Sequence, residues 1–247
     1  MHSPLISIAV PIYNTARYLP AALDSLLAQD YPHWEGLLWD DGSSDGSGRI
    51  AAAFAARDAR FRVLGDGNNR GAASVLTDSF THANGRFLAS VDSDDVLETR
   101  ALSSMLAFMQ RHPQLGMCYS QYTEISEIGH HLGLGRRCQT PYSPHHLLLE
   151  FMTYQFRMIR KEAYHAVGGI DPNARFAEDY DLCLRLSETC AIGHLPQPLY
   201  RYRIRSDSVS SSQRLQQIRA TFAASERALQ RRGMAASHTL PLGIRAR

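Results

Sequence analysis

The first 97 residues repeat one pattern, in which a short apolar run is followed by a polar turn and then by a stretch with helical spacing. The apolar runs are residues 5–10, 37–39, 61–64 and 85–91, and the helix-forming stretches are residues 16–29, 50–56 and 71–83. Such alternation is typical of a parallel sheet covered by helices on both faces. The sequence therefore predicts an α/β fold with a mostly parallel central sheet.

Three of the predicted strands end in polar residues. Residues 11–14 end the first strand, Asp40 and Asp41 follow the second, and residues 92–95 follow the fourth. In open parallel sheets, ligands bind beyond the carboxyl ends of the strands. Each group is also ordinary turn material, but three such turns along one edge of a sheet favour a common binding site.

The sequence Asp92-Ser93-Asp94-Asp95 places three carboxylates where a buried strand reaches the surface. Carboxylates this close repel one another unless a cation lies between them, and Mg²⁺ or Mn²⁺ prefers such oxygen ligands. An acidic turn that caps the next helix is the alternative interpretation. The chain has neither GxGxxG nor GxxxxGK[ST], which argues against a dinucleotide fingerprint and a P-loop.

Length, charge and cysteine use limit the class of protein. A chain of 247 residues can form one extended α/β domain or two joined lobes, and its net charge of +2 is too small to indicate a nucleic-acid partner. The sequence shows no signal-peptide core, no CxxC pair, and no apolar run approaching the roughly 20 residues that cross a bilayer. We therefore expect a cytoplasmic protein whose membrane contact, if any, is peripheral.

The alternation stops after residue 97. We expect a helix at residues 102–109, a strand at 151–159 and a short helix at 161–167 that ends at two glycines. Residues 127–146 form a long segment with glycines and four histidines. A loop that contacts the acceptor is favoured over a histidine metal site, because no i,i+4 pair of histidines lies on a predicted helix.

Charged residues mark three later elements. Glu178, Asp179 and Asp181 fall in the first turn of a predicted helix, where acids stabilise the helix dipole by roughly 0.3–1 kcal/mol without any catalytic role. Alternation over residues 199–205 puts three arginines on one face of a strand, which either faces water or binds an anion. Residues 213–232 form an arginine-rich helix, for which docking is favoured over membrane anchoring.

Six motifs occur in an informative order: Pro11-Ile12-Tyr13-Asn14, Asp40-Asp41-Gly42-Ser43-Ser44-Asp45, Asn69-Arg70-Gly71, Asp92-Ser93-Asp94, Gly168-Gly169-Ile170-Asp171 and Glu178-Asp179-Tyr180-Asp181-Leu182. In this order, across residues 6–210, they resemble the inverting family 2 glycosyltransferases of GT-A fold. The resemblance implies a Rossmann-like sheet with a C-terminal acceptor-side region. It also implies sugar transfer from a nucleotide diphosphate donor to a hydroxyl.

The resemblance assigns roles to particular residues. Tyr13 and Asp41 would hold the base, with Asp40 beside them, and Asp92 would lie near the ribose. The nucleotide-binding positions are Pro11, Tyr13, Asn14, Asp40, Asp41, Arg70, Asp92 and Ser93.

The resemblance also implies the catalytic groups. Asp94 would bind Mn²⁺ or Mg²⁺ with support from Asp95, and Asp179 would be the catalytic base. The family commonly ends its core with Tyr-Arg-x-His, whereas this chain has Tyr202-Arg203-Ile204-Arg205. We therefore expect Arg203 and Arg205 to face the diphosphate, with a row of solvated arginines as the alternative.

The implied partners are a nucleotide sugar, with UDP favoured as the commonest donor nucleotide, and a glycan or lipid-linked acceptor. The sequence leaves open peripheral membrane contact and a homodimer. We expect a nucleotide-sugar half at residues 1–97, an acceptor and base half at 98–210, and a helix and tail at 211–247. A sugar nucleotidyltransferase is the first alternative, but it should open with a Gly-rich triphosphate loop. A non-catalytic binding relative is the second.

Overall fold

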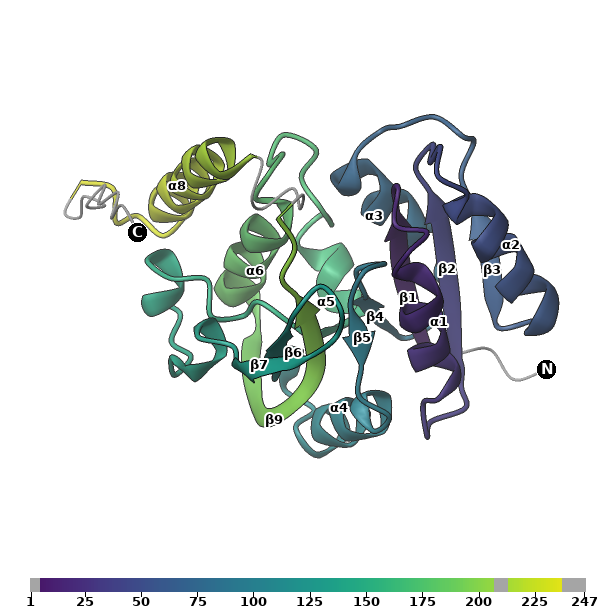
Figure 1. Ribbon diagram of the computed structural model, residues 1–247. Helices are drawn as coiled ribbons and strands as arrows, with labels where there is room; N and C mark the ends of the chain where they lie inside the picture. The colour runs from purple at the N-terminus through teal and green to yellow at the C-terminus, as the bar shows by residue number, and fades with distance from the viewer. Residues whose placement is uncertain (1–4, 207–212, 237–247) are drawn as a thin grey trace.

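The computed structural model describes residues 5–206 and 213–236, and a nine-stranded sheet runs through its centre (Figure 1). The strand order is β3-β2-β1-β4-β8-β6-β9-β5, and β7 pairs with β6. The strands are β1 (Ile6–Ile12), β2 (Trp34–Asp40), β3 (Phe61–Leu64), β4 (Phe87–Ser90), β5 (Val96–Leu97), β6 (Leu115–Ile125), β7 (His131–Leu134), β8 (Arg157–Arg160) and β9 (Ala191–Arg203).

The predicted mostly parallel sheet is confirmed by the strand directions. Neighbours in the series β3-β2-β1-β4 pair in parallel. Strand β8 is antiparallel to both β4 and β6, so β6 runs in the same direction as the first four strands, and β9 is parallel to β6. Only β5, β7 and β8 of the described strands run the other way.

Helices cover both faces of the sheet, as Figure 1 shows. Helices α1, α2 and α4 bury residues such as Leu23, Phe54 and Met105 on one face, whereas α3, α5 and α6 bury Phe80, Tyr164 and others on the opposite face. The helices are α1 (Leu19–Leu27), α2 (Ser47–Arg57), α3 (Ala72–Thr81), α4 (Ala101–Arg111), α5 (Lys161–Ala166), α6 (Glu178–Thr189) and α8 (Arg214–Arg231). Because helices cover both faces, the side chains on both sides of the central strands are buried, and these strands are continuous apolar runs in the sequence.

The prediction of a strand over residues 151–159 is wrong in its first part, since β8 begins at Arg157. The preceding apolar residues pack as an aromatic cluster instead. The ring of Phe151 lies 5.0 Å from that of Tyr180, and the ring of Tyr154 lies 5.4 Å from that of Tyr202. Apolar character there serves side-chain packing, which a short run does not distinguish from a strand.

The segment after residue 126 is more ordered than predicted. It contains β7, which pairs with β6, and two short 3₁₀ helices, η1 (Arg137–Gln139) and η2 (His146–Leu148). The predicted C-terminal helix is confirmed as α8, which lies against α6, whereas residues 237–247 of the predicted tail are outside the described part of the chain. No helix among the described residues is both long and apolar enough to span a bilayer.

Candidate active site

The loops that follow β1, β2 and β4 meet at one edge of the sheet. Asn14 Oδ1 accepts a hydrogen bond from the Ser44 N–H at 2.9 Å, which joins the first loop to the second. Thr15 Oγ1 lies 3.0 Å from Ser93 Oγ, which joins the first loop to the acidic turn. The convergence that the sequence predicted is therefore present, because neighbouring parallel strands end at the same edge.

The Asp40-Asp41 pair holds the surrounding loops. Both carboxylate oxygens of buried Asp41 accept backbone N–H groups, from Arg70 at 2.6 Å and from Gly71 at 2.9 Å. Asp40 Oδ1 accepts the Ser43 N–H at 3.0 Å. A Cβ atom at Gly48 would collide with Asp40 Oδ2, so the start of α2 can approach this carboxylate only with a glycine there. Asp41 thus anchors the turn before α3.

The remaining nucleotide-binding candidates differ in exposure. Tyr13 is 52% exposed just beyond the end of β1, whereas Pro11 is half-buried within the strand. Arg70 pairs with Asp78 at 3.0 Å, and its guanidinium lies over the Trp39 ring. Tyr13 therefore presents an accessible aromatic surface, while Arg70 is already held by neighbours.

The acidic turn after β4 places three carboxylates close together, and one of them, Asp94, pairs with Arg205. Burial, and then the charge of Asp94, raises the pKa of Asp92 to about 7. Burial also raises the pKa of Asp95 well above its usual range, with Asp92 and Asp94 adding to the effect. A cation at this turn would offset the repulsion, and carboxylate oxygens are suitable ligands for a hard divalent ion. The turn therefore fits such an ion.

The three acids of this turn have different surroundings. Asp95 is 1% exposed, and its Oδ1 accepts the backbone N–H of Arg203 at 2.7 Å, so it ties the turn to β9. Asp92 Oδ2 accepts a hydrogen bond from Gln155 Nε2 at 3.2 Å. Asp94 has a side chain that is 21% exposed and is the most open of the described metal-ligand candidates. Among the described residues no group of three or more His, Cys, Asp or Glu is placed to hold a metal ion.

Arg203 and Arg205 both reach the acidic turn. Arg205 Nη1 lies 2.8 Å from Asp94 Oδ2, and Arg203 Nε donates to the Asp94 carbonyl oxygen at 2.7 Å. Both guanidinium groups lie over the ring of Tyr18, at 4.7 Å and 5.1 Å from its centroid. The two arginines are thus oriented by the turn and by an aromatic surface, rather than extended into solvent.

The third arginine of the predicted strand does not contact the acidic turn. Arg201 pairs with Glu98 at 2.6 Å instead. Glu127 also contacts this region: its side chain accepts from the Tyr18 hydroxyl at 2.9 Å, and its carbonyl accepts from Arg203 Nη1 at 3.0 Å. The start of the segment 127–146 therefore lies beside the acidic turn. That the segment 127–146 contacts the acceptor stays a prediction.

The three acids at the start of α6 have distinct environments. Asp181 is 1% exposed and pairs with Arg185 at 2.8 Å and Arg227 at 3.2 Å, so it cannot meet an acceptor. The side chain of Asp179 is 36% exposed, and its Oδ1 accepts the Tyr180 N–H at 2.8 Å. Asp179 is therefore the more accessible of these two carboxylates.

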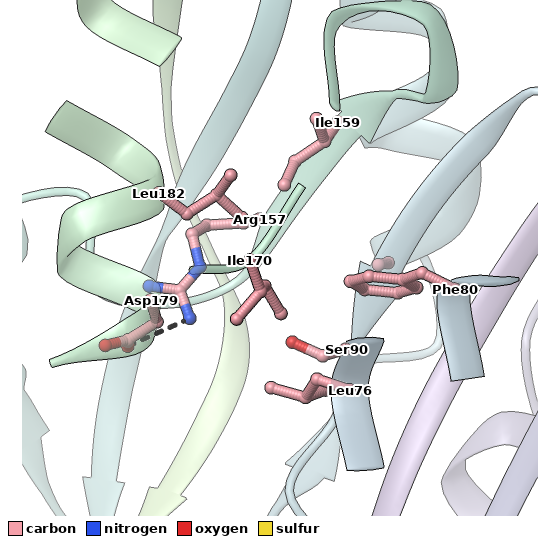
Figure 2. Close-up of a pocket in the computed structure, with 9 residues that line it drawn as sticks. Leu76, Phe80, Ser90, Arg157, Ile159, Ile170, Asp179 and Leu182 are labelled. Atoms are coloured by element: carbon pink, nitrogen blue, oxygen red, sulfur yellow. Dashed lines mark hydrogen bonds and ion pairs between the residues drawn. The ribbon is translucent and has the colours of Figure 1, made fainter. Parts of the chain in front are cut away.

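Arg157 is a site residue that the sequence analysis missed. Its Nη2 donates to Asp179 Oδ2 (Figure 2) at 3.2 Å. Its Nη1 donates to the Thr153 carbonyl oxygen at 3.1 Å. Burial opposes the charge on Arg157, but the carboxylates of Asp179 and Asp92 outweigh it and raise the arginine pKa. The only local signal is a single arginine inside an apolar run, and its partner depends on the position of α6.

One segment connects the two acidic groups. Gln155 contacts Asp92, and Arg157, two residues later, contacts Asp179. Beside Arg157 and Asp179 lies a small cavity of about 30 Å³ with apolar walls that include Leu76 and Phe80. The acidic turn after β4 and the carboxylate on α6 therefore belong to one site.

Glu178 provides a pH-dependent test of this geometry. Burial, and then the charge of Asp179, raises the pKa of Glu178 to about 6, and its Oε2 has no hydrogen-bond partner among the described residues. Because the pKa of Glu178 is higher in the folded state, protonation of Glu178 stabilises the fold. This contribution is fully present below the unfolded pKa and is lost as pH rises through about 6. We expect Glu178→Gln to raise the free energy of unfolding at pH 7 by about 1–2 kcal/mol. Urea titrations at pH 4.5 and pH 7 would check this, and an equal effect at both values would contradict it.

A sheet of this order, with an acidic turn after β4 and a second carboxylate on α6, defines the GT-A class of fold. Residues 7–177 match the family described as Glycosyl transferase family 2, and the chain belongs to that family. Asp179 lies just beyond the matched range.

Known relatives agree with this assignment. The putative glycosyltransferase EpsE of Bacillus subtilis is 32% identical over 83% of this chain and 75% of its own length. The O-antigen biosynthesis protein RfbC of Myxococcus xanthus is 31% identical over 99% of this chain, and the hyaluronan synthase of Pasteurella multocida is 28% identical over 94%. The chain spans only 19% and 24% of the lengths of these two proteins.

Two solved structures share the fold. TarS of S. aureus, residues 1–349 in complex with UDP-GlcNAc, superposes with a TM-score of 0.71 at 21% identity, covering 91% of this chain and 70% of that chain. The mannosyltransferase PcManGT from Pyrobaculum calidifontis, in complex with GDP-Man and Mn²⁺, has a TM-score of 0.65 at 16% identity, covering 98% and 78% of the two chains.

Proposed function

We propose that this chain is the catalytic part of an inverting glycosyltransferase that acts in polysaccharide or glycoconjugate synthesis. It transfers a sugar from a nucleotide diphosphate donor, UDP being favoured, to a hydroxyl of a glycan or lipid-linked acceptor. The observation that carries this proposal is the link from Asp92 through Gln155 and Arg157 to Asp179. The names of RfbC and hyaluronan synthase, and the UDP-GlcNAc bound to TarS, support it.

The donor lies along the edge where the first three loops meet. Exposed Tyr13 stacks on the base, while Asp40 and Asp41 order the loops around it. Asp92 is close to the ribose. Asp94 would hold a divalent ion, which would supply Lewis-acid stabilisation to the leaving diphosphate.

The reaction also requires that a residue of this chain accept the proton of the acceptor hydroxyl. The acceptor oxygen attacks the anomeric carbon while the bond from that carbon to the diphosphate breaks, and the diphosphate leaves with the electron pair. Asp179 accepts the proton of the acceptor hydroxyl, and Arg157 keeps this carboxylate ionised and oriented. One base on the face opposite the leaving group is sufficient for inversion, so no covalent nucleophile is needed.

A thermal-shift screen of nucleotide sugars, with and without Mn²⁺, tests the donor assignment. A ligand that binds only the folded state raises the unfolding temperature by mass action. We expect one nucleotide sugar to raise it more with Mn²⁺ than without, and the same donor to support transfer to a glycan acceptor. Binding without transfer would favour the non-catalytic alternative. Release of pyrophosphate from a nucleoside triphosphate and a sugar phosphate would favour a nucleotidyltransferase.

Arg205 is expected to stabilise the leaving diphosphate. Its guanidinium pairs with Asp94, and its side chain is only 10% exposed. The positive charge is therefore poorly hydrated near the place where the leaving diphosphate gains negative charge. Arg205→Ala should lower kcat by about 10²-fold, as for removal of one preorganised donor. Arg205→His should restore part of the loss. Equal kcat for the wild type and both variants would show that the arginine only covers the surface.

A further inference from the structure

Helix α8 contacts the end of α6 that carries Asp179. It lies beyond residues 7–177, which match the family, and it packs on α6 through a stripe of small and apolar residues. Its buried residues are Ala224, Ser225, Ala228 and Leu229. Polar contacts from α8 fall at two places on α6, one at the first turn and one at Glu188 near the last turn.

The first contact is made through buried Asp181. Arg227 Nη2 lies 3.2 Å from Asp181 Oδ1, and Arg185 Nε lies 2.8 Å from Asp181 Oδ2. Arg185 Nη1 also donates to the carbonyls of Val167 at 2.7 Å and Gly169 at 2.6 Å. Asp181 thus joins α8 to the turn that precedes α6.

The second contact at the first turn involves the Tyr180 hydroxyl. It donates to the Leu147 carbonyl and lies 3.0 Å from Ser225 Oγ. Ser225 Oγ in turn donates to the Leu148 carbonyl at 3.0 Å. Both Tyr180 and Ser225 are almost fully buried, so α8, η2 and the first turn of α6 are connected away from solvent.

The first turn receives no side-chain cap from the residue that precedes the helix. That residue is Ala177, and within the turn the Tyr180 N–H donates to Asp179 Oδ1 at 2.8 Å. Uncapped first turns have up to four N–H groups without an intrahelical partner and tend to fray. From the sheet side, Arg157 holds Asp179. The contacts of Tyr180 and Asp181 hold the same turn from the other side.

We propose that α8 positions the catalytic base. Arg227 and Ser225 are positioning residues: they hold Asp181 and Tyr180, and thereby fix the direction of the neighbouring Asp179, which Arg157 contacts. This inference rests on the proposed function, in which Asp179 is the base. A misplacement of about 1 Å in a catalytic group can cost about 10²-fold in rate, so loosening this turn should reduce kcat without affecting the donor site.

A matched pair of variants tests the proposal in the full chain. Arg227→Met removes the pair with Asp181. Arg231→Met removes a pair of similar exposure on the same helix, since the arginine side chains are 38% and 34% exposed, but that pair involves Glu188. Hydrogen exchange over residues 177–182, the unfolding midpoint, kcat and donor KM are measured for both variants.

We expect Arg227→Met to accelerate amide exchange in the first turn and to lower kcat by about 10- to 100-fold at unchanged donor KM. Arg231→Met should leave exchange there and kcat unchanged. Ser225→Ala should resemble Arg227→Met, and Arg227→Lys should recover part of the activity, because it restores a positive charge beside Asp181. Equal exchange and equal kcat for the two methionine variants would overturn the proposal. Faster exchange in Arg227→Met alone, in a protein whose wild type transfers no sugar, would support the positioning of the turn and overturn the proposed function only.

Discussion

Asp179→Asn is expected to lower kcat for sugar transfer by about 10²- to 10⁴-fold, while donor affinity stays close to that of the wild type. Asp179 accepts the Tyr180 N–H through Oδ1 and the Arg157 guanidinium through Oδ2, and the single acceptor oxygen of the amide can keep one of these two hydrogen bonds. It cannot take up a proton at neutral pH. Steady-state kinetics at saturating donor, together with calorimetric binding of the nucleotide, would separate the chemical step from binding.

The neighbouring acids serve as controls for this experiment. Glu178→Gln should keep transfer activity. Asp181→Asn should instead destabilise the fold by about 3–5 kcal/mol, because it leaves Arg185 and Arg227 without their buried partner. If Glu178→Gln alone abolished transfer, Glu178 would be the base. Activity in all three variants would exclude a carboxylate base at this turn.

The second large effect is expected for Asp94→Ala. Loss of its carboxylate should remove both the metal dependence of donor binding and more than about 10²-fold of the transfer rate, because a Lewis acid at the leaving group contributes several kcal/mol. Mn²⁺ titration monitored by electron paramagnetic resonance, in the presence of nucleoside diphosphate, would measure the binding directly.

Glu98→Gln is a matched control for the Asp94 experiment. Glu98 lies four residues later and pairs with Arg201, which does not reach the acidic turn. This variant should bind Mn²⁺ and turn over donor as the wild type does. Normal transfer by chelator-treated wild-type protein would contradict the metal assignment, and it would leave the positive charge at the diphosphate to Arg203 and Arg205.

Local sequence predicts the edge of the sheet at which the loops after β1, β2 and β4 meet. Apolar runs that end in Asn14, Asp41 and Asp92 predict parallel strands, and parallel neighbours must present their carboxyl ends on one side. The hydrogen bonds from the first loop to Ser44 and Ser93 follow from that rule. No knowledge of side-chain packing is needed, because backbone pairing alone brings these turns together.

Residue periodicity is less informative in the second half. The apolar run that begins at Phe151 predicts a strand, yet its aromatic rings pack on α6 and β9 instead. Alternation predicts one face for three arginines, but only Arg203 and Arg205 contact Asp94, because Glu98 lies within reach of Arg201. In both cases the outcome depends on which distant element supplies the partner.

The sequence by itself determined the α/β class, the order of the motifs and the identity of the acids available for metal binding and proton transfer. Tertiary structure decided which acid is accessible: Asp181 is buried between arginines from two helices, and Asp179 is held by Arg157 from β8. The reason is physical. Secondary structure follows spacing along the chain, whereas the environment of a carboxylate depends on burial and on charges brought close by pairing over long sequence separations.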